Sequence, residues 1–195
     1  MGVSAKSIVN NEKELHEQVY YILRKYQQTA LVEDFIDGRE VTVGLVGNLE
    51  GPVAQRLPDD LDAPRIIAGL RFLPPMEVNL EPYLETDAVY SNRLKSEIPE
   101  EVTYFCPAEL TGDQLDDLNW LAAATFRVLD AKDVSRIDFR LDRHDNFKPY
   151  ILEINPLPGL SSISDIVIEA AAAGIGQTEL VHMILDAALK RHGMQ

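Results

Sequence analysis

The chain has 195 residues, of which 46% are hydrophobic and 26% charged, which is typical of an ordinary soluble globular protein. Its formal net charge of -14 at pH 7 argues against nucleic acid or an anionic membrane as the main partner. The single cysteine, Cys106, excludes an internal disulfide framework and favours a reducing cytoplasm, and no apolar run is long enough to span a bilayer.

The first elements read as a helix followed by a β-hairpin. A helix is predicted over residues 12–27, because Asn11 can cap its first turn and Glu14 completes a capping box. The stretches 29–36 and 39–46 then predict two strands around an Asp-Gly turn. An antiparallel sheet should therefore begin directly after the first helix.

The middle of the chain, residues 58–107, is rich in proline and charge and has weak periodicity. It predicts long loops around short strands near residues 65–72 and 104–106, and loops of this length are often functional. Helical periodicity returns later in the chain. The helices expected there span residues 113–130, 164–173 and 177–191, with Gly193 as a C-terminal stop. Helices mixed with antiparallel hairpins indicate the α+β class.

Residues 134–141 and 150–155 predict another antiparallel hairpin, because a polar turn separates two alternating apolar stretches. Side chains along a strand change face at every residue, so charged residues two apart share a face. If Asp138 lies opposite Glu153, then Arg136 lies opposite Asn155, with Ile151 on the same face. All four polar side chains could then reach one ion.

Two carboxylates directly opposite each other destabilise a sheet unless a cation lies between them. Asp138, Glu153 and Asn155 offer hard oxygen ligands, which suit magnesium better than zinc. The alternative is a solvated polar face on an amphipathic hairpin, which explains the opposed carboxylates less well. The residues alone therefore favour a metal site.

Four segments resemble the ATP-grasp ligases, the last three of them the D-alanine–D-alanine ligase branch, and they occur in the family's order. They are Val32–Val43, Tyr104–Ala108, Ser135–Asp138 and Glu153–Leu160. The resemblance implies an ATP-grasp C-terminal domain, with an antiparallel sheet, flanking helices and the N-terminal regions missing. It also implies ATP as a cofactor and an amino acid as substrate.

The resemblance implies that Glu33 accepts a hydrogen bond from the adenine amino group. The backbone around Asp34, Phe35 and Ile36 would contact the ring, and Glu40 would bind the ribose hydroxyls. The chemistry fits, because a carboxylate is a good acceptor for a diol. The alternative is that Glu33 and Glu40 are ordinary surface charges of a hairpin.

The same resemblance assigns Asp138, Glu153 and Asn155 to magnesium or manganese bridging the ATP phosphates. Arg136 and the Gly159 N–H would stabilise the oxyanion of a tetrahedral intermediate. The alternative for Arg136 is a salt bridge to one of these carboxylates, and both roles can hold. The implied reaction phosphorylates a carboxylate with ATP, after which an amine attacks the acyl phosphate and phosphate leaves.

Ser164, near a predicted helix start, would bind the carboxylate of the amine substrate, although such a serine can equally be an N-cap. A phosphate-binding cation is implied near Tyr90. Residue type favours Lys95, spacing favours Arg93, and a solvated basic loop is a third alternative. Pro156 departs from the usual D-alanine ligase pattern and weakens D-alanine as the substrate.

Residues 1–4 resemble the end of the family's glycine-rich phosphate loop. We therefore expect residues 1–195 to be one truncated ATP-binding domain, with 1–30 a remnant of the central subdomain and 31–195 the C-terminal ligase subdomain. The expected assembly is a homodimer, or a complex with a partner chain that supplies the missing N-terminal part. The alternatives are a non-catalytic remnant, a partner-dependent subunit, or a ligase for another amino acid or peptide.

Overall fold

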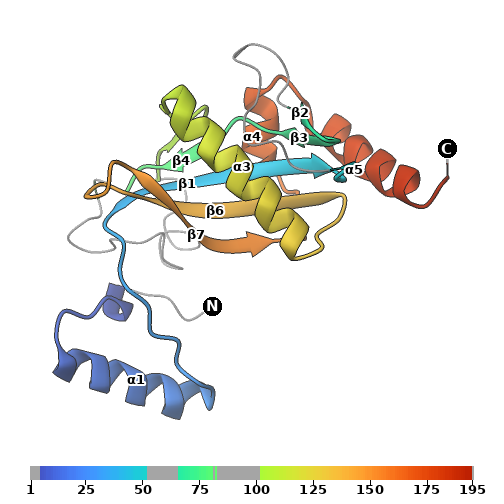
Figure 1. The fold of residues 1–195 in the computed structure, drawn as a ribbon. Helices are drawn as coiled ribbons and strands as arrows, with labels where there is room; N and C mark the ends of the chain where they lie inside the picture. Colours follow the sequence, from blue (N-terminus) through green and yellow to red (C-terminus); the bar gives the residue numbers. More distant parts are fainter. Residues whose placement is uncertain (1–4, 52–65, 81, 83–101, 195) are drawn as a thin grey trace.

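The computed structural model describes residues 5–51, 66–80, 82 and 102–194. Helices and antiparallel strands alternate along the chain, which confirms the α+β class (Figure 1). The helical elements are η1 (Ala5–Ser7), α1 (Glu12–Tyr26), α3 (Gly112–Val128), α4 (Asp165–Ala172) and α5 (Gln177–Arg191). The strands are β1 (Gly38–Gly47), β2 (Ile66–Ile67), β3 (Leu70–Phe72), β4 (Met76–Val78), β5 (Tyr104–Phe105), β6 (Val134–Asp142) and β7 (Lys148–Asn155).

Strand β1 is the centre of the sheet. One of its edges pairs with β6 over nearly its whole length, from Gly38 opposite Asp142 to Val46 opposite Val134. Its other edge pairs with β3 and β4, and β7 extends the sheet beyond β6. The pairing is antiparallel throughout, so side chains at alternate positions of β1 and β6 form two opposite faces.

The sheet has a helical layer on each face (Figure 1). On one face, α3 packs its buried side chains against the alternate residues of β1 and β6. This first core includes Val41, Val43, Leu45, Ile137, Phe139, Leu118, Ala122 and Phe126. On the other face, α4 and α5 cover one end of the sheet. This second core includes Val46, Val134, Ile166, Val167, Ala170 and Leu180.

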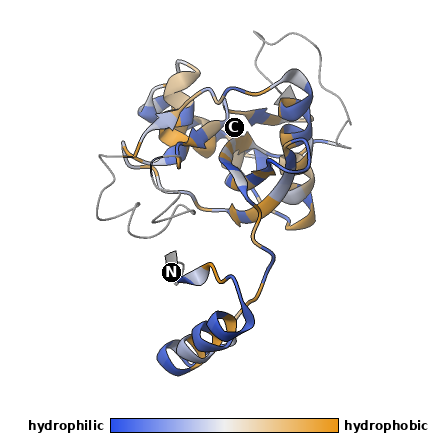
Figure 2. Ribbon diagram, turned by 90° about the vertical axis from the view of Figure 1, so that its left-hand side faces the viewer, coloured by the Kyte–Doolittle hydropathy of each residue, from blue (hydrophilic) through white to orange (hydrophobic). Residues whose placement is uncertain are grey.

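Helix α1 lies apart from the sheet in both views and has no buried residue (Figures 1 and 2). Its predicted cap is confirmed, because the Asn11 side chain accepts a hydrogen bond from the Glu14 N–H at 3.0 Å. A groove of about 660 Å³ lies between this helix and residues 28–35. The helix and its connecting segment therefore line the same groove, apart from the sheet.

The predicted strand over residues 29–36 is wrong. These residues are not part of a strand, and β1 begins directly after them at Gly38. The physical reason is that both edges of β1 are occupied, one by β6 and the other by β3 and β4. No free edge of β1 is left for a hairpin partner.

The other predicted elements agree with the structure within a few residues, including all three helices after residue 110 and the short strands near 66–72 and 104–105. Gly193 has the positive φ of 67° that a helix stop requires. Strand β4 was not predicted. No helix in the described part of the chain is long and apolar enough to cross a membrane.

A buried glutamate lies where α4 meets β1. Glu169 has no exposed surface, and neither of its carboxyl oxygens has a hydrogen-bond partner among the described residues. Gly44 makes room for it, since a Cβ there would lie 2.2 Å from Glu169 Oε2. Burial raises the pKa of Glu169 well above its usual value, and the charge of Asp165 adds to this shift. Folding therefore favours the protonated form of this carboxyl group relative to the unfolded chain.

Removing a buried ring from the first core should destabilise the chain strongly. Phe126→Ala should lower the free energy of unfolding by about 3–5 kcal/mol, since it deletes a side chain that is 2% exposed. Urea unfolding measures this change. Val128→Ala on the same helix, where Val128 is 80% exposed, is the control and should change stability by less than about 0.5 kcal/mol. Equal costs for the two variants would contradict the packing of α3.

The raised pKa of Glu169 also predicts a pH dependence. The folded chain keeps a proton that the unfolded chain releases above its ordinary pKa of 4.5, so this contribution to stability is lost as pH rises. The free energy of unfolding of Glu169→Gln, relative to that of the wild type, should therefore increase with pH, by at most about 1.4 kcal/mol per pH unit. Urea unfolding between pH 5 and pH 8 checks this. The exposed Glu179→Gln is the control. If the difference in free energy of unfolding between Glu169→Gln and the wild type were the same at every pH, the prediction would be refuted.

Candidate functional site

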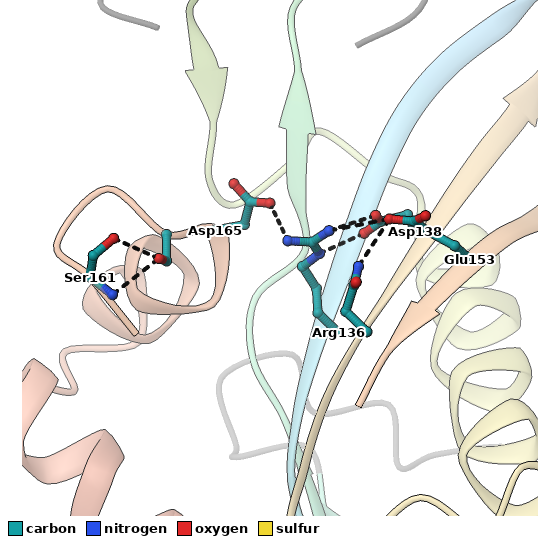
Figure 3. Close-up of polar contacts among 7 residues, drawn as sticks. Arg136, Asp138, Glu153, Ser161 and Asp165 are labelled. Atoms are coloured by element: carbon teal, nitrogen blue, oxygen red, sulfur yellow. Dashed lines mark hydrogen bonds and ion pairs between the residues drawn. The ribbon is translucent and has the colours of Figure 1, made fainter. Parts of the chain in front are cut away.

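The β6–β7 hairpin brings together the four polar residues that the sequence placed on one face. Asp138 lies opposite Glu153 and Arg136 lies opposite Asn155, so the predicted register is confirmed. Figure 3 shows Arg136, Asp138 and Glu153 close together. Strand alternation explains why these side chains share a face. Ile137, which lies between Arg136 and Asp138, points the other way and is fully buried in the first core. The hairpin thus separates a charged face from an apolar one.

The predicted alternation fails at one position. The register shifts between Asp138 and Phe139, and Ile151 pairs with Phe139, which faces the first core. Leu152 is left without a cross-strand partner, as in a β-bulge. Ile151 therefore does not share the face of Glu153, and the bulge sits beside the acidic residues.

Arg136 is the hub of the charged cluster (Figure 3). Its Nε and Nη2 donate to the two oxygens of Asp138, both at 2.8 Å, and its Nη1 donates to Asp165 Oδ2 at 2.7 Å. Burial disfavours the charge, but the bonds and charges of Asp138 and Asp165 outweigh it and raise the pKa of Arg136. Such a bidentate pair fixes the plane of the guanidinium group.

Arg136 also relieves the repulsion between the opposed carboxylates. Its Nη2 lies 3.7 Å from Glu153 Oε1, and the Asn155 side chain donates to the same oxygen at 3.0 Å. The salt-bridge alternative for Arg136 is therefore seen in this structure. Asp138 is nearly buried while Glu153 is more than half exposed, so the pair is open to solvent on one side.

The donor set fits a hard cation. Asp138, Glu153 and Asn155 supply two carboxylates and an amide, and a small cavity of about 10 Å³ borders Asp138 and Arg136. The described part of the chain has no group of three or more His, Cys, Asp or Glu side chains that could hold a metal. A magnesium ion here would need further oxygens, as it commonly takes from phosphates. It would also have to displace Arg136 from Asp138.

The N-terminus of α4 faces this cluster (Figure 3). Ser164 occupies the N-cap position, but its hydroxyl makes no capping bond and instead bonds to the Ser161 hydroxyl at 2.9 Å and accepts from the Ser161 N–H at 3.1 Å. Gly159 lies close by, since a Cβ there would be 2.9 Å from Ser164 Oγ. Asp165, the next residue, connects the helix to Arg136. The structure therefore brings Gly159, Ser164 and Arg136 to one end of the sheet.

The predicted adenosine segment lies at the other end of the charged face. Glu33 and Asp34 are exposed and line the groove beside α1. Glu40 is not a surface charge, because its side chain is 14% exposed and its Oε2 lies 2.9 Å from Arg140 Nη1. Phe35 and Ile36 also contact the same arginine.

Some predicted residues lie outside the described part of the chain. These are Tyr90, Arg93 and Lys95, together with residues 1–4. Cys106 is described. Burial raises the pKa of its thiol to about 12, and the charge of Glu169 contributes. A thiol this hard to ionise is a packing residue rather than a nucleophile.

Sequence reasoning gave no role to Arg140, Asp165 or Glu169. Strand alternation already placed Arg140 on the face of Arg136 and Asp138, so its position could have been found. Asp165 and Glu169 are four residues apart and share one helix face, but nothing in the sequence showed that this face meets β1. Their contacts to the cluster depend on how α4 docks.

Comparisons with known proteins identify the family of the chain. A family model described as "D-ala D-ala ligase C-terminus" matches residues 74–186, more than half of the chain. One curated relative, the uncharacterized protein y4sG of Sinorhizobium fredii, is 35% identical over 95% of this chain and 48% of its own length. The D-alanine–D-alanine ligase of Methylibium petroleiphilum is 31% identical over 85% of this chain and 44% of its own length.

Solved structures show the same fold. The D-alanine–D-alanine ligase of Coxiella burnetii aligns with a TM-score of 0.67 and 21% identity, over 95% of this chain and 41% of that one. The Bacillus anthracis enzyme complexed with ATP aligns with a TM-score of 0.63 and 21% identity, over 94% of this chain and 50% of that one. The chain spans about half the length of the curated relatives it matches. It belongs to the D-alanine–D-alanine ligase C-terminal family of the ATP-grasp superfamily.

Proposed function

We propose that this chain forms the ATP- and magnesium-binding part of a carboxylate–amine ligase of the D-alanine–D-alanine type. The observation that carries the proposal is the cluster of Arg136, Asp138, Glu153 and Asn155 on one face of the β6–β7 hairpin. In a member of this family, such a cluster is suited to the phosphate end of a nucleotide. The curated relatives named as ligases and the ATP-bound neighbour support the same conclusion.

In the proposed reaction, an oxygen of a substrate carboxylate attacks the γ-phosphorus of ATP, and ADP leaves. An amine then attacks the acyl carbon, and the tetrahedral intermediate collapses with loss of phosphate. Magnesium would neutralise phosphate charge, held by Asp138, Glu153 and Asn155. The protein's own work is to position the groups and to supply hydrogen-bond donors where negative charge develops.

Arg136 would be the main donor to that charge. Three of its N–H groups are bound to Asp138 and Asp165 in this structure. A cation on Asp138 would compete with two of these bonds and release their N–H groups toward the substrate. The N–H of Gly159 would complete the oxyanion site, and Ser164 would bind the amine substrate beside it.

The division of the chain is part of the proposal. We infer that residues 31–195 form the C-terminal ligase subdomain and that residues 1–30 belong to the central subdomain. The separation of α1 from the sheet supports this division (Figure 1). The nucleotide would bind along the charged face, with its base near Glu33, Phe35 and Ile36 and its ribose near Glu40.

A second candidate is a ligase of the same family whose amine substrate differs from D-alanine. Asp165 favours it, because this carboxylate lies between Ser164 and Arg136 and would repel a substrate carboxylate bound there. The comparison that separates the candidates is ATP-dependent phosphate release with D-alanine and with an amine that lacks a carboxylate. Stimulation by D-alanine alone would exclude the second candidate.

The first prediction from the proposal concerns nucleotide affinity. The chain should bind ATP weakly and in a magnesium-dependent manner, and Asp138→Asn or Glu153→Gln should weaken binding at least about tenfold, since each removes an oxygen charge from the ion. Isothermal titration calorimetry with and without magnesium measures this effect. The exposed Asp186→Asn on α5 is the control and should bind like the wild type. No binding at millimolar ATP with magnesium would exclude the proposal for this chain.

The second prediction concerns the exchange between Arg136 and a cation. Arg136→Met should lower the free energy of unfolding by about 3 kcal/mol, since it leaves the nearly buried Asp138 and Asp165 without their arginine. Millimolar magnesium should recover part of this loss by taking the place of the guanidinium. Urea unfolding with and without magnesium tests both effects.

Arg191→Met is the matched control for this experiment, because Arg191 makes a similar bidentate pair with Asp133 away from the site. Its stability should not depend on magnesium. If magnesium stabilised both variants equally, the ion would not act at Asp138, and the proposed exchange would be wrong.

A further inference from the structure

Arg140 is a buried arginine on the charged face of the sheet. It lies on β6 two residues after Asp138, and its Cα pairs with that of Glu40 on β1. Its side chain is only 4% exposed, which is unusual for an arginine. Neither the resemblance to the ligase family nor the proposed reaction gives this residue a role.

The guanidinium group of Arg140 joins three positions of the proposed adenosine segment. Its Nε donates to the backbone carbonyl of Ile36 at 3.0 Å, and its Nη1 lies 2.9 Å from Glu40 Oε2. Its Cζ lies 5.4 Å from the centre of the Phe35 ring, within the range of a cation–π contact. One side chain therefore contacts the residues proposed for both the base and the ribose.

The segment needs such contacts because it has no sheet pairing. Residues 29–36 are not part of a strand, and Phe35 is 47% exposed. The edges of β1 that could have held them are taken by β3, β4 and β6. Side-chain bonds from the sheet must therefore define the path of the segment, and Arg140 makes them from a rigid strand.

Burial of this charge is costly, which argues against an incidental contact. Burial lowers the pKa of Arg140, and the charge of Glu40 opposes that shift. A hydrophobic residue of similar size at this position would avoid the cost of desolvation. A fork of parallel N–H donors, by contrast, can bind a carboxylate and a carbonyl at the same time, which lysine cannot do in the same way.

We propose that Arg140 is a positioning residue that holds Phe35, Ile36 and Glu40 in the arrangement that binds the base and ribose of the nucleotide. This inference rests on the proposed nucleotide binding by the same face. Arg140 acts through the segment and not on the phosphates. Replacement of Arg140 should therefore weaken binding of the nucleoside part of the ligand and leave the metal-dependent binding of its phosphates unchanged.

Arg39 offers a matched control. It is the neighbour of Glu40 in the chain but points to the opposite face, where it binds both oxygens of Glu77 at 2.8 and 2.6 Å. It also donates to the Glu109 carbonyl at 2.8 Å, and its Cζ lies 5.9 Å from the Phe147 ring. Arg39→Met thus removes the same kinds of contact as Arg140→Met, but away from residues 35–36.

The test uses the full chain with Arg140→Met, Arg140→Lys, Arg39→Met and Asp138→Asn. Calorimetry measures binding of ADP without metal and of inorganic tripolyphosphate with magnesium. Arg140→Met should weaken ADP binding at least fivefold and leave tripolyphosphate binding unchanged, whereas Asp138→Asn should do the reverse. Arg39→Met should change neither by more than twofold, and Arg140→Lys should weaken ADP binding by an intermediate factor, because it keeps only the charge.

Hydrogen exchange gives a readout that needs no ligand. The amides of residues 33–37 should exchange faster in both Arg140 variants than in the wild type, while Arg39→Met leaves them unchanged. If Arg140→Met does not fold, the lysine variant carries both measurements. Provided that the wild type binds ATP, either of two results would overturn the inference. One is that an Arg140 variant binds ADP as well as Arg39→Met does. The other is that an Arg140 variant loses tripolyphosphate binding by the same factor as ADP binding. Failure of the wild type to bind any nucleotide would overturn the proposed function and this inference with it.

Discussion

The antiparallel pairing of β1 with β6 is the constraint on which the rest of the structure depends. Nine residue pairs fix the register, so that Arg140, Asp138 and Arg136 follow one another on one face, opposite Glu40, Thr42 and Gly44. Their neighbours Ile137 and Phe139 enter the first core under α3. A slip of one residue would exchange the two faces and bury three charged groups among apolar side chains, so the core enforces the site.

The charged face keeps its carboxylates in place by binding them to two arginines. Arg136 pairs with Asp138 and Asp165, which joins the hairpin to α4, and Arg140 pairs with Glu40. Glu169, four residues after Asp165 on α4, is fully buried, and burial raises its pKa because a buried charge is costly. In the proposed function, ligand binding at this face would require an exchange of partners, since a cation or phosphate would replace ion pairs that already exist.

The elements that the sequence predicted correctly are those marked by residues close together in the chain, such as a helix cap or the alternation of a strand. The Asn11 cap starts α1, and the alternation around Arg136 and Asp138 gave both the β6–β7 hairpin and its register. Prediction failed where the outcome depended on competition between segments. Residues 29–36 have the composition of a strand but lose to β3, β4 and β6 for the edges of β1. The bulge opposite Asp138 likewise breaks an alternation that the sequence shows as regular.

The sequence by itself therefore determined the α+β class, the hairpin face with Arg136, Asp138, Glu153 and Asn155, and the likeness to the ligase family, because periodicity and motif spacing are properties of neighbouring residues. Only the tertiary structure decided which groups meet across the fold. The docking of α4 on β1 gives Arg136 its second acid, Asp165, and the pairing of β1 with β6 gives Arg140 its place behind residues 35–36. Such contacts join residues that are about 30 to 100 positions apart, and only the packing of helices and strands brings them together.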